Sequence, residues 1–167
     1  MALKITESTE ESLILTLLDL ANHLTRNGER IARREGLTAQ QWLLLLQIAG
    51  DPNFPNLGAT AEAGSAVLAS NIAAARGVSR PTISALVSSL VQKGLVFQEE
   101  DPGDRRQKAL RATPAGLEVL ARIQGPRHRA NQELLADFDT PEIERVLRVL
   151  QSCLDTLWQA GRTGDKD

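Results

Sequence analysis

Apolar side chains recur every three or four residues along most of the chain, and this spacing predicts helices. A first helix begins with a capping box formed by Ser8 and Glu11 and stops at Gly36. A second begins with a capping box over Thr38–Gln41, carries an apolar run and ends at Gly50. The apolar face expected for the first helix comprises Leu13, Leu17, Leu20, Leu24 and Ile31.

The middle of the chain predicts a loop, two more helices and a hairpin. Two prolines and two glycines over 51–64 favour an irregular loop. Helices are expected over 65–76 and 80–93. The pattern then changes: 95–98 and 107–112 read as two strands, joined by a turn at Asp101-Pro-Gly-Asp104.

Helices return in the last third of the chain. Thr113-Pro114 is an N-cap followed by a proline at the first helical position. Gly125-Pro126 is expected to end or kink that helix. Thr140-Pro141-Glu142 repeats the cap signature, and the polar tail 161–167 is expected to fray. The last helix carries a heptad-like stripe of Ile143, Val146, Leu147, Leu150, Leu154, Leu157 and Trp158.

Composition excludes several classes of protein. One cysteine, Cys153, cannot form an internal disulfide, and two histidines do not supply a conventional zinc set, so no metal or cofactor is expected. The longest apolar run is too short to span a bilayer, and the N-terminus has no secretory pattern, which predicts a soluble cytoplasmic protein. Scarce aromatic residues disfavour binding of single-stranded nucleic acid by base stacking.

The net charge of −2 hides a segregation of charge. Residues 70–112 contain seven Lys/Arg and four Asp/Glu, a local balance of +3, and 63–98 contain no carboxylate. A surface that faces a polyanion needs such a segment, because nearby carboxylates oppose the approach of phosphate. Chance clustering in an alanine-rich stretch is the alternative, and charge alone does not decide between them.

The spacing of small and apolar residues across 68–93 is typical of a helix-turn-helix. A small residue at Ala73 allows two helices to cross closely, and Gly77 gives the turn its backbone freedom. Val78, Ile83 and Leu86 are expected to fill the wedge between the helices.

The second of these helices has two faces. Its buried stripe comprises Ile83, Leu86, Val87, Leu90 and Val91. Its remaining side chains are short hydrogen-bonding groups and one cation: Arg80, Thr82, Ser84, Ser88 and Ser89. Ser79 is expected to cap the helix, and Pro81 fits its first turn. Such a face suits the major groove of DNA, although an ordinary surface helix in a bundle is the alternative.

The hairpin carries cations at and beside its tip, namely Arg105, Arg106 and Lys108. Guanidinium groups on an extended loop can enter the narrow minor groove. Asp104 is expected to pair with Arg106, which would fix the tip and let Arg105 project. A solvated charge run is the alternative.

Three motifs in order resemble the MarR family of transcription regulators over about residues 10–160. They are Thr38-Ala-Gln-Gln-Trp42 before the leucine run, Val78-Ser-Arg-Pro-Thr-Ile-Ser84 opening a helix, and Asp101-Pro-Gly-Asp-Arg-Arg106 followed by Thr113-Pro-Ala-Gly116. The resemblance implies a mainly α fold, a winged helix-turn-helix with a β-hairpin wing and terminal dimerisation helices. It also implies a homodimer on a pseudo-palindromic double-stranded operator, and an effector pocket between the two parts.

Carried over by position, the resemblance places Ser79, Arg80, Pro81, Thr82 and Ser84 at the start of the recognition helix, and Asp104, Arg105 and Arg106 on the wing. The polar helix face adds Ser88 to the expected DNA contacts, and the hairpin adds Lys108. The expected division is 1–36 and 113–167 for dimerisation and 37–112 for DNA binding, in one compact chain. Departures from the family pattern are the long 51–64 loop, Ala112, the Gly125-Pro126 break, and the acidic pair Glu99 and Glu100.

Some residues have a functional and a structural interpretation. In this architecture His23, Arg26 and Trp42 could line an effector pocket for an aromatic or anionic molecule, although such a tryptophan is more often core. The basic cluster of Arg122, Arg127, His128 and Arg129 could contact the DNA backbone or bind an acid, although a solvated helix end is the favoured interpretation. Cys153 lies off the heptad stripe with no adjacent base, which favours an inert thiol over a redox sensor.

The sequence therefore favours a dimeric DNA-binding regulator, a repressor relieved by a small molecule. A winged-helix module that binds protein instead of DNA is the alternative, supported by the near-neutral net charge and Glu99/Glu100. No phosphate-binding glycine loop with lysine, nucleophile–base pair or metal-ligand spacing is present, so an enzyme is not expected.

Overall fold

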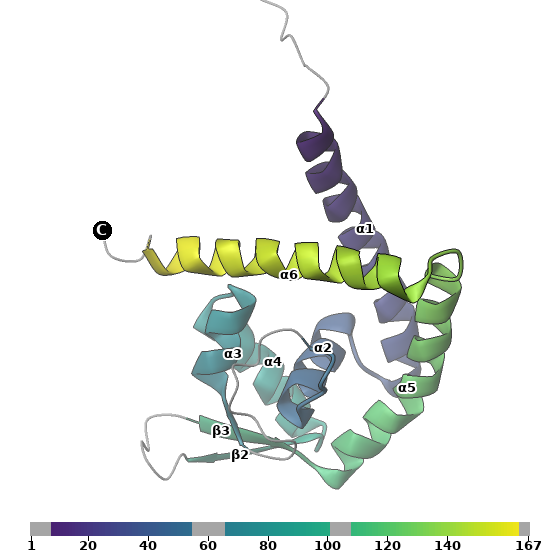
Figure 1. The fold of residues 1–167 in the computed structure, drawn as a ribbon. Coiled ribbons are helices and arrows are strands. Elements are labelled where there is room, and N and C mark those ends of the chain that lie inside the picture. The colour runs from purple at the N-terminus through teal and green to yellow at the C-terminus, as the bar shows by residue number, and fades with distance from the viewer. Residues whose placement is uncertain (1–7, 55–65, 101–107, 164–167) are drawn as a thin grey trace, which may run out of the picture.

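The computed structural model describes residues 8–54, 66–100 and 108–163. Figure 1 shows a helical protein with one small sheet at its lower edge. In chain order the elements are α1 (Thr9–Ala32), the 3-10 helix η1 (Arg33–Glu35), α2 (Ala39–Ala49), β1 (Val67–Leu68), α3 (Ala69–Arg76), α4 (Arg80–Gln92), β2 (Val96–Glu100), β3 (Lys108–Ala112), α5 (Pro114–Leu134) and α6 (Thr140–Thr163).

Helix α2 is at the centre of the core. Its leucines at 44 and 45 are fully buried, and it packs against α1, α4, α5 and β3. The expected capping box forms: Gln41 N–H donates to Thr38 Oγ1, and the Thr38 backbone N–H donates to Gln41 Oε1. Gly50 ends the helix in the left-handed conformation, as expected.

The helix-turn-helix forms as predicted between α3 and α4. Ala73 and Ile83 are buried where the two helices meet, and Gly77 adopts a φ of 60° in the turn. Two apolar positions are more exposed than expected, one from the predicted wedge and one from the predicted buried stripe. Val78 is 39% exposed because only its backbone faces inward, with its N–H donating to Ala73 O, and Val91 is 36% exposed at the edge of the stripe.

The expected hairpin is part of a three-stranded antiparallel sheet with the order β1-β3-β2. The predicted helix over 65–76 is wrong at its start, because Val67 and Leu68 form β1 and pair with Leu110 and Ala109. This pairing covers the outer edge of β3 and buries Val67. Strand β2 begins at Val96 and continues to Glu100, beyond the predicted strand.

Helix α5 runs without interruption through Gly125 and Pro126, so of the two expected outcomes, an end or a kink, the end does not occur. Val119 and Ile123 are buried on the N-terminal side of the proline and hold that part of the helix on the core. In Figure 1 the axis of α5 bends as it rises from the sheet toward α6. A bend is the usual way for a helix to accommodate the missing N–H and the ring of an internal proline.

Two helix starts are also corrected. Asp139, not Thr140, caps α6: Glu142 N–H donates to Asp139 Oδ1 and Asp139 N–H donates to Glu142 Oε2. At α1, Glu11 N–H donates to Ser8 Oγ as expected, but the Ser8 hydroxyl donates to Glu10 and the reciprocal half of the box is not formed by Glu11.

The start of α5 is fixed to the turn that follows α4. Thr113 N–H donates to Leu95 O, and the Thr113 hydroxyl donates to Gly94 O at 2.7 Å. Gly116 then passes so close to this turn that an added Cβ would lie 2.3 Å from Leu95 O. Only glycine allows this approach, whereas at Gly125 a Cβ would meet nothing closer than Arg129 Nη1 at 3.6 Å.

We therefore expect opposite effects from two glycine substitutions in α5. Gly116→Ala should lower the free energy of unfolding by about 2 kcal/mol or more, because backbone must move. Gly125→Ala should raise it by roughly 0.5–1 kcal/mol through better helix propensity. Urea denaturation at one fixed protein concentration measures both; a G116A variant as stable as G125A would contradict the close packing.

Candidate nucleic-acid interface and ligand cavity

The polar face of α4 is exposed along its length. Ile83, Val87 and Leu90 hold the other face in the core. The side chains that the sequence assigns to DNA recognition are all exposed: Ser79, Arg80, Pro81, Thr82, Ser84 and Ser88. The helix thus presents one cation and several hydroxyls outward.

The first turn of α4 is ordered by Ser79. Thr82 N–H donates to Ser79 Oγ at 3.3 Å, and the two hydroxyls are 2.8 Å apart. This cap fixes the direction in which Arg80 leaves the helix. Ser89 differs from the other serines, because its hydroxyl accepts a 2.7 Å hydrogen bond from Gln41 Nε2 and so faces α2.

The wing is described only at its base. Asp104, Arg105 and Arg106, and the expected pairing of Asp104 with Arg106, lie outside the described residues. Lys108 is exposed at the start of β3, and its Nζ lies 3.7 Å from Glu100 Oε1 on β2. Glu100 therefore offsets part of the positive charge that Lys108 was expected to present to DNA.

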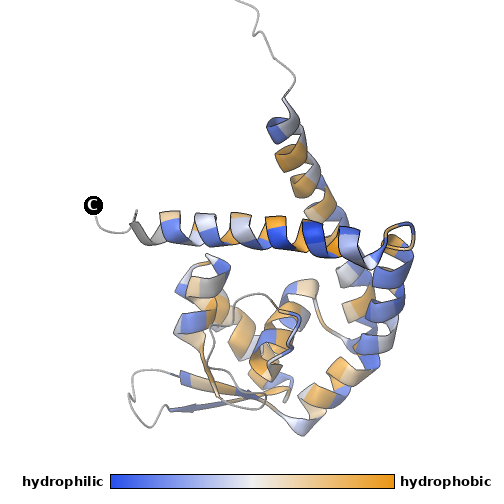
Figure 2. Ribbon diagram, viewed as in Figure 1, coloured by the Kyte–Doolittle hydropathy of each residue, from blue (hydrophilic) through white to orange (hydrophobic). Residues whose placement is uncertain are grey.

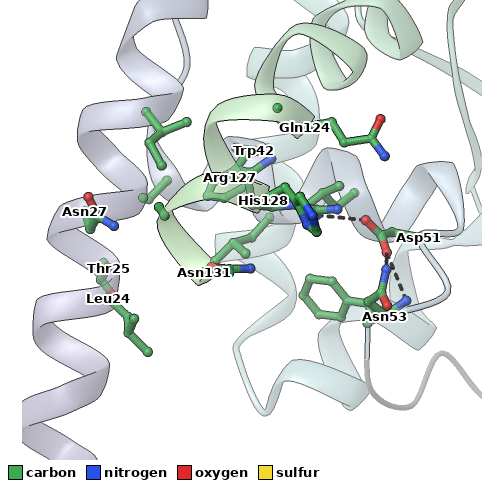
Figure 3. Close-up of a pocket in the computed structure, with 18 residues that line it drawn as sticks. Leu24, Thr25, Asn27, Trp42, Asp51, Asn53, Gln124, Arg127, His128 and Asn131 are labelled. Carbon is green, nitrogen blue, oxygen red and sulfur yellow. Dashed lines mark hydrogen bonds and ion pairs between the residues drawn. The ribbon is translucent and has the colours of Figure 1, made fainter. Parts of the chain in front are cut away.

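A cavity of about 1000 Å³ lies between α1, α2, α5 and the turn after α2. Figure 3 shows Leu24, Thr25 and Asn27 of α1 on one side and Asp51 and Asn53 on the other. The apolar wall contains Leu24, Ile31, Trp42, Leu43, Leu46 and Phe54, and the polar wall contains Asn27, Asp51, Asn53, Gln124, Arg127, His128 and Asn131.

Of the three residues predicted for an effector pocket, Trp42 lines this cavity. It is 7% exposed, and its indole N–H has no acceptor among the described residues. His23 and Arg26 are not part of the lining; both are exposed on α1, where His23 Nε2 lies 3.7 Å from Asp19 Oδ1. In the sequence of α1, each is next to a residue that lines the cavity: His23 precedes Leu24, and Arg26 precedes Asn27.

The polar wall contains an ion pair. Arg127 Nη1 donates to Asp51 Oδ2 at 2.8 Å, and the two side chains are 23% and 11% exposed. Burial opposes ionisation of Asp51, but the hydrogen bonds from Arg127 and from the Asn53 N–H and side chain outweigh it, so the pKa of Asp51 lies below its ordinary value. The sequence favoured a solvated helix end for Arg127, and this is wrong, because its side chain is mostly buried and paired with Asp51.

Other candidate chemistry is limited. The described residues contain no group of three or more His, Cys, Asp or Glu side chains placed to hold a metal ion. None of the helices in the described ranges is long and apolar enough to cross a membrane. Cys153 is a free, exposed thiol on α6.

Comparison with known proteins decides the family. A family model described as MarR matches residues 35–107. The transcriptional activatory protein BadR of Rhodopseudomonas palustris is 30% identical over 146 residues, which cover 87% of this chain and 78% of that protein. The chain belongs to the MarR family of transcriptional regulators. Its relatives are regulators and not enzymes, in agreement with the sequence.

Solved MarR-type regulators share the fold at low sequence identity. The Streptomyces coelicolor regulator PcaV, solved in complex with its natural ligand, is 24% identical with a TM-score of 0.65 and covers 92% of this chain and 98% of its own. The S. aureus MepR–DNA complex is 18% identical with a TM-score of 0.67 and covers 90% and 99%. These likenesses confirm the predicted winged-helix architecture of a MarR protein.

We expect the Asp51–Arg127 pair to contribute to the pH dependence of stability in this MarR protein. Because the folded pKa of Asp51 is depressed, its contribution is present above the ordinary aspartate pKa of 3.8 and is lost as the pH falls through the lower folded value. Asp51→Asn should therefore lower the free energy of unfolding by about 1–3 kcal/mol at neutral pH, because it removes a charged hydrogen bond.

Urea denaturation of wild type and D51N from neutral pH down to about pH 3 tests this expectation. The difference between the two free energies of unfolding should narrow toward the acid end, whereas Asp155→Asn, exposed on α6, should follow wild type throughout. A D51N deficit that persists unchanged in acid would show that the Asp51 charge is not responsible.

Proposed function

We propose that two copies of this chain form a homodimer that binds a pseudo-palindromic double-stranded DNA operator, and that a small aromatic or anionic molecule in the cavity weakens this binding. The observation that carries the proposal is the exposure of the polar face of α4 from Ser79 to Ser88; Ser89, bonded to Gln41, is the exception. A recognition helix must present such a face to the groove instead of burying it against its own chain.

The chemistry of that face favours DNA over a protein partner. Arg80 can pair with guanine in the major groove, and Thr82, Ser84 and Ser88 can bind base edges or phosphates. No carboxylate occurs on α3 or α4 or in the turn between them, so nothing on these helices repels phosphate. Arg105 and Arg106 are proposed to extend the contact into the minor groove from the wing.

The two terminal helices support a dimer. On α1 and α6 many large apolar side chains are about half exposed or more: Leu13, Ile14, Leu15, Leu18, Val146, Leu147, Val149 and Leu157. Figure 2 shows these apolar positions recurring along both helices, and the N-terminal half of α1 standing out from the rest of the fold. An apolar surface of this extent marks a protein interface, and a second copy of the chain offers the same surface.

The cavity is positioned to affect the recognition helix. The Glu29 carboxylate of α1 accepts a hydrogen bond from Ala39 N–H at the start of α2, and Gln41 in the same turn holds Ser89 of α4. Trp42, next to Gln41, lines the cavity. A ligand that changes the spacing of α1, α2 and α5 therefore acts on the element that positions α4.

Release from DNA gives relief of repression where the operator overlaps a promoter, and we propose this repressor role for the protein. We also propose a cytoplasmic location, where the protein would meet its operator.

We expect Arg80→Ala to lower affinity for a duplex selected from a random pool, and to reduce discrimination against unselected duplex, by about tenfold or more. Arg105→Ala should lower affinity for both duplexes alike and reduce the salt slope. Gln92→Ala, exposed at the other end of α4, is the matched control and should bind as wild type. Fluorescence anisotropy over a series of salt concentrations measures all three.

If selection from the random pool enriches no duplex, and the wild type shows no salt-sensitive affinity for any duplex, DNA binding is refuted. The winged-helix protein-interaction module would then be the better description. An R80A variant indistinguishable from Q92A would instead refute the assignment of α4 as the recognition helix.

We also expect Leu157→Glu to shift the protein from dimer to monomer at micromolar concentration, because a buried charge at an interface is costly. Leu157 is 68% exposed in a single chain, so the substitution should leave the fold intact. Phe97→Glu, on β2 and 54% exposed, is a control outside both segments assigned to dimerisation and should remain dimeric. Analytical ultracentrifugation distinguishes the outcomes; a dimeric L157E would exclude this part of α6 from the interface.

A further inference from the structure

In the larger cavity, the guanidinium of Arg127 is already paired with a carboxylate of the protein, that of Asp51. The formal charges among its lining residues are Asp51 and Arg127, with His128 the other titratable group. The structure gives one hydrogen bond from the Arg127 guanidinium within the described residues, and it goes to Asp51 Oδ2. The group best suited to bind an acid is therefore already occupied by an acid of the protein itself.

The pair also lines a second, smaller cavity. This cavity of about 370 Å³ shares Trp42, Leu46, Asp51, Asn53, Gln124 and Arg127 with the larger one. Arg127 comes from α5 and Asp51 from the turn after α2, which are 76 residues apart in the chain. The ion pair therefore joins α5 to the end of α2.

Asp51 is held mainly by this turn. Its Oδ1 accepts hydrogen bonds from the Asn53 N–H and side-chain amide, both at 2.9 Å, and Phe54 N–H donates to Asp51 O. If another anion takes Arg127, Asp51 keeps these three contacts and loses one. The exchange therefore needs no rebuilding of the turn.

A second feature favours a polar ligand at this place. The Trp42 indole N–H is buried without an acceptor among the described residues, and Trp42 lines both cavities. A buried donor without a partner costs free energy, which an acceptor on a bound ligand would recover. The apolar side chains of Leu24, Ile31 and Leu43 offer the rest of the cavity to a hydrocarbon body.

We propose that Asp51 is an internal competitor for an aromatic carboxylate ligand: it occupies Arg127, and the carboxylate of the ligand binds by displacing it. This inference rests on the proposed ligand-binding role of the cavity and specifies how that site selects its ligand. Because two carboxylates on one guanidinium repel each other, Asp51 lowers the affinity for every anion and sets a threshold concentration for binding. Displacement also separates α5 from the end of α2.

Binding of naphthalene-2-carboxylate and of its neutral isostere naphthalene-2-carboxamide to the full chain tests the proposal by isothermal titration calorimetry. Asp51→Asn should bind the carboxylate about tenfold more tightly than wild type does, and the carboxamide within about twofold. Arg127→Gln should bind the carboxylate more weakly than wild type. The double variant D51N/R127Q should lose the gain of D51N.

A matched control is Asp155→Asn, which removes the same charge from an exposed position on α6 and should bind both probes as wild type does. Quenching of Trp42 fluorescence in a Trp158→Phe background reports that the probe enters this cavity. The proposal is overturned if D51N does not change the preference for carboxylate over carboxamide, if D51N/R127Q keeps the gain, or if D51N binds neither probe.

These outcomes are separate from the failure of DNA binding. The affinity of wild type and D51N for the selected duplex is measured without probe. If the protein binds the carboxylate as expected but binds no duplex, the Asp51 proposal stands and the DNA-binding proposal fails. If it binds duplex but D51N has no effect on probe binding, the DNA-binding proposal stands and the Asp51 proposal fails.

Discussion

The burial of α2 on nearly all sides is the constraint on which the rest of the structure depends. A helix that is apolar around its whole circumference must be enclosed by other elements. Here α1, α4, α5 and β3 supply the enclosure, so α1, which we assign to dimerisation, and α4, which we assign to DNA recognition, contact one common partner. In α2, Trp42 faces the cavity and Gln41 faces α4.

This arrangement makes the polar contacts of α2 informative. Gln41 is buried and uses both ends of its amide, one for the Thr38 backbone and one for Ser89. Ser89 lies on the helix that we assign to recognition, but its side chain bonds that helix to α2 and is not part of the outer face. The angle at which α4 leaves the core is therefore set in part by the first turn of α2, which also receives Glu29 of α1.

The elements that the sequence predicts well are those specified by local rules. The turn glycine Gly77, the Ser79 cap and the spacing to Ile83 define the helix-turn-helix over residues 77–83, and all three behave as expected. Strand β1 was missed because two residues show no alternation, and they become a strand only by pairing with β3. The ion pair of the cavity was missed for the same reason, since only the folded chain brings Asp51 to Arg127. In contrast, the exclusion of His23 and Arg26 follows from helical phase, because the face predicted from Leu24 and Ile31 is the one that meets the cavity.

The close approach of Gly116 to Leu95 and the burial of Val119 and Ile123 fix the first part of α5, so any pivot of this helix lies beyond Ile123. From Ile123 to Leu134 the helix extends about 16 Å at 1.5 Å per residue, and α6 follows its far end. Arg127 is about a third of the way along this arm. A tilt of about 5° around the pivot would move the far end by roughly 1.5 Å over that length, while the part held by the core remained still. Small displacements at the ion pair are thereby enlarged at the end of the arm that α6 joins, as in a lever with one fixed end.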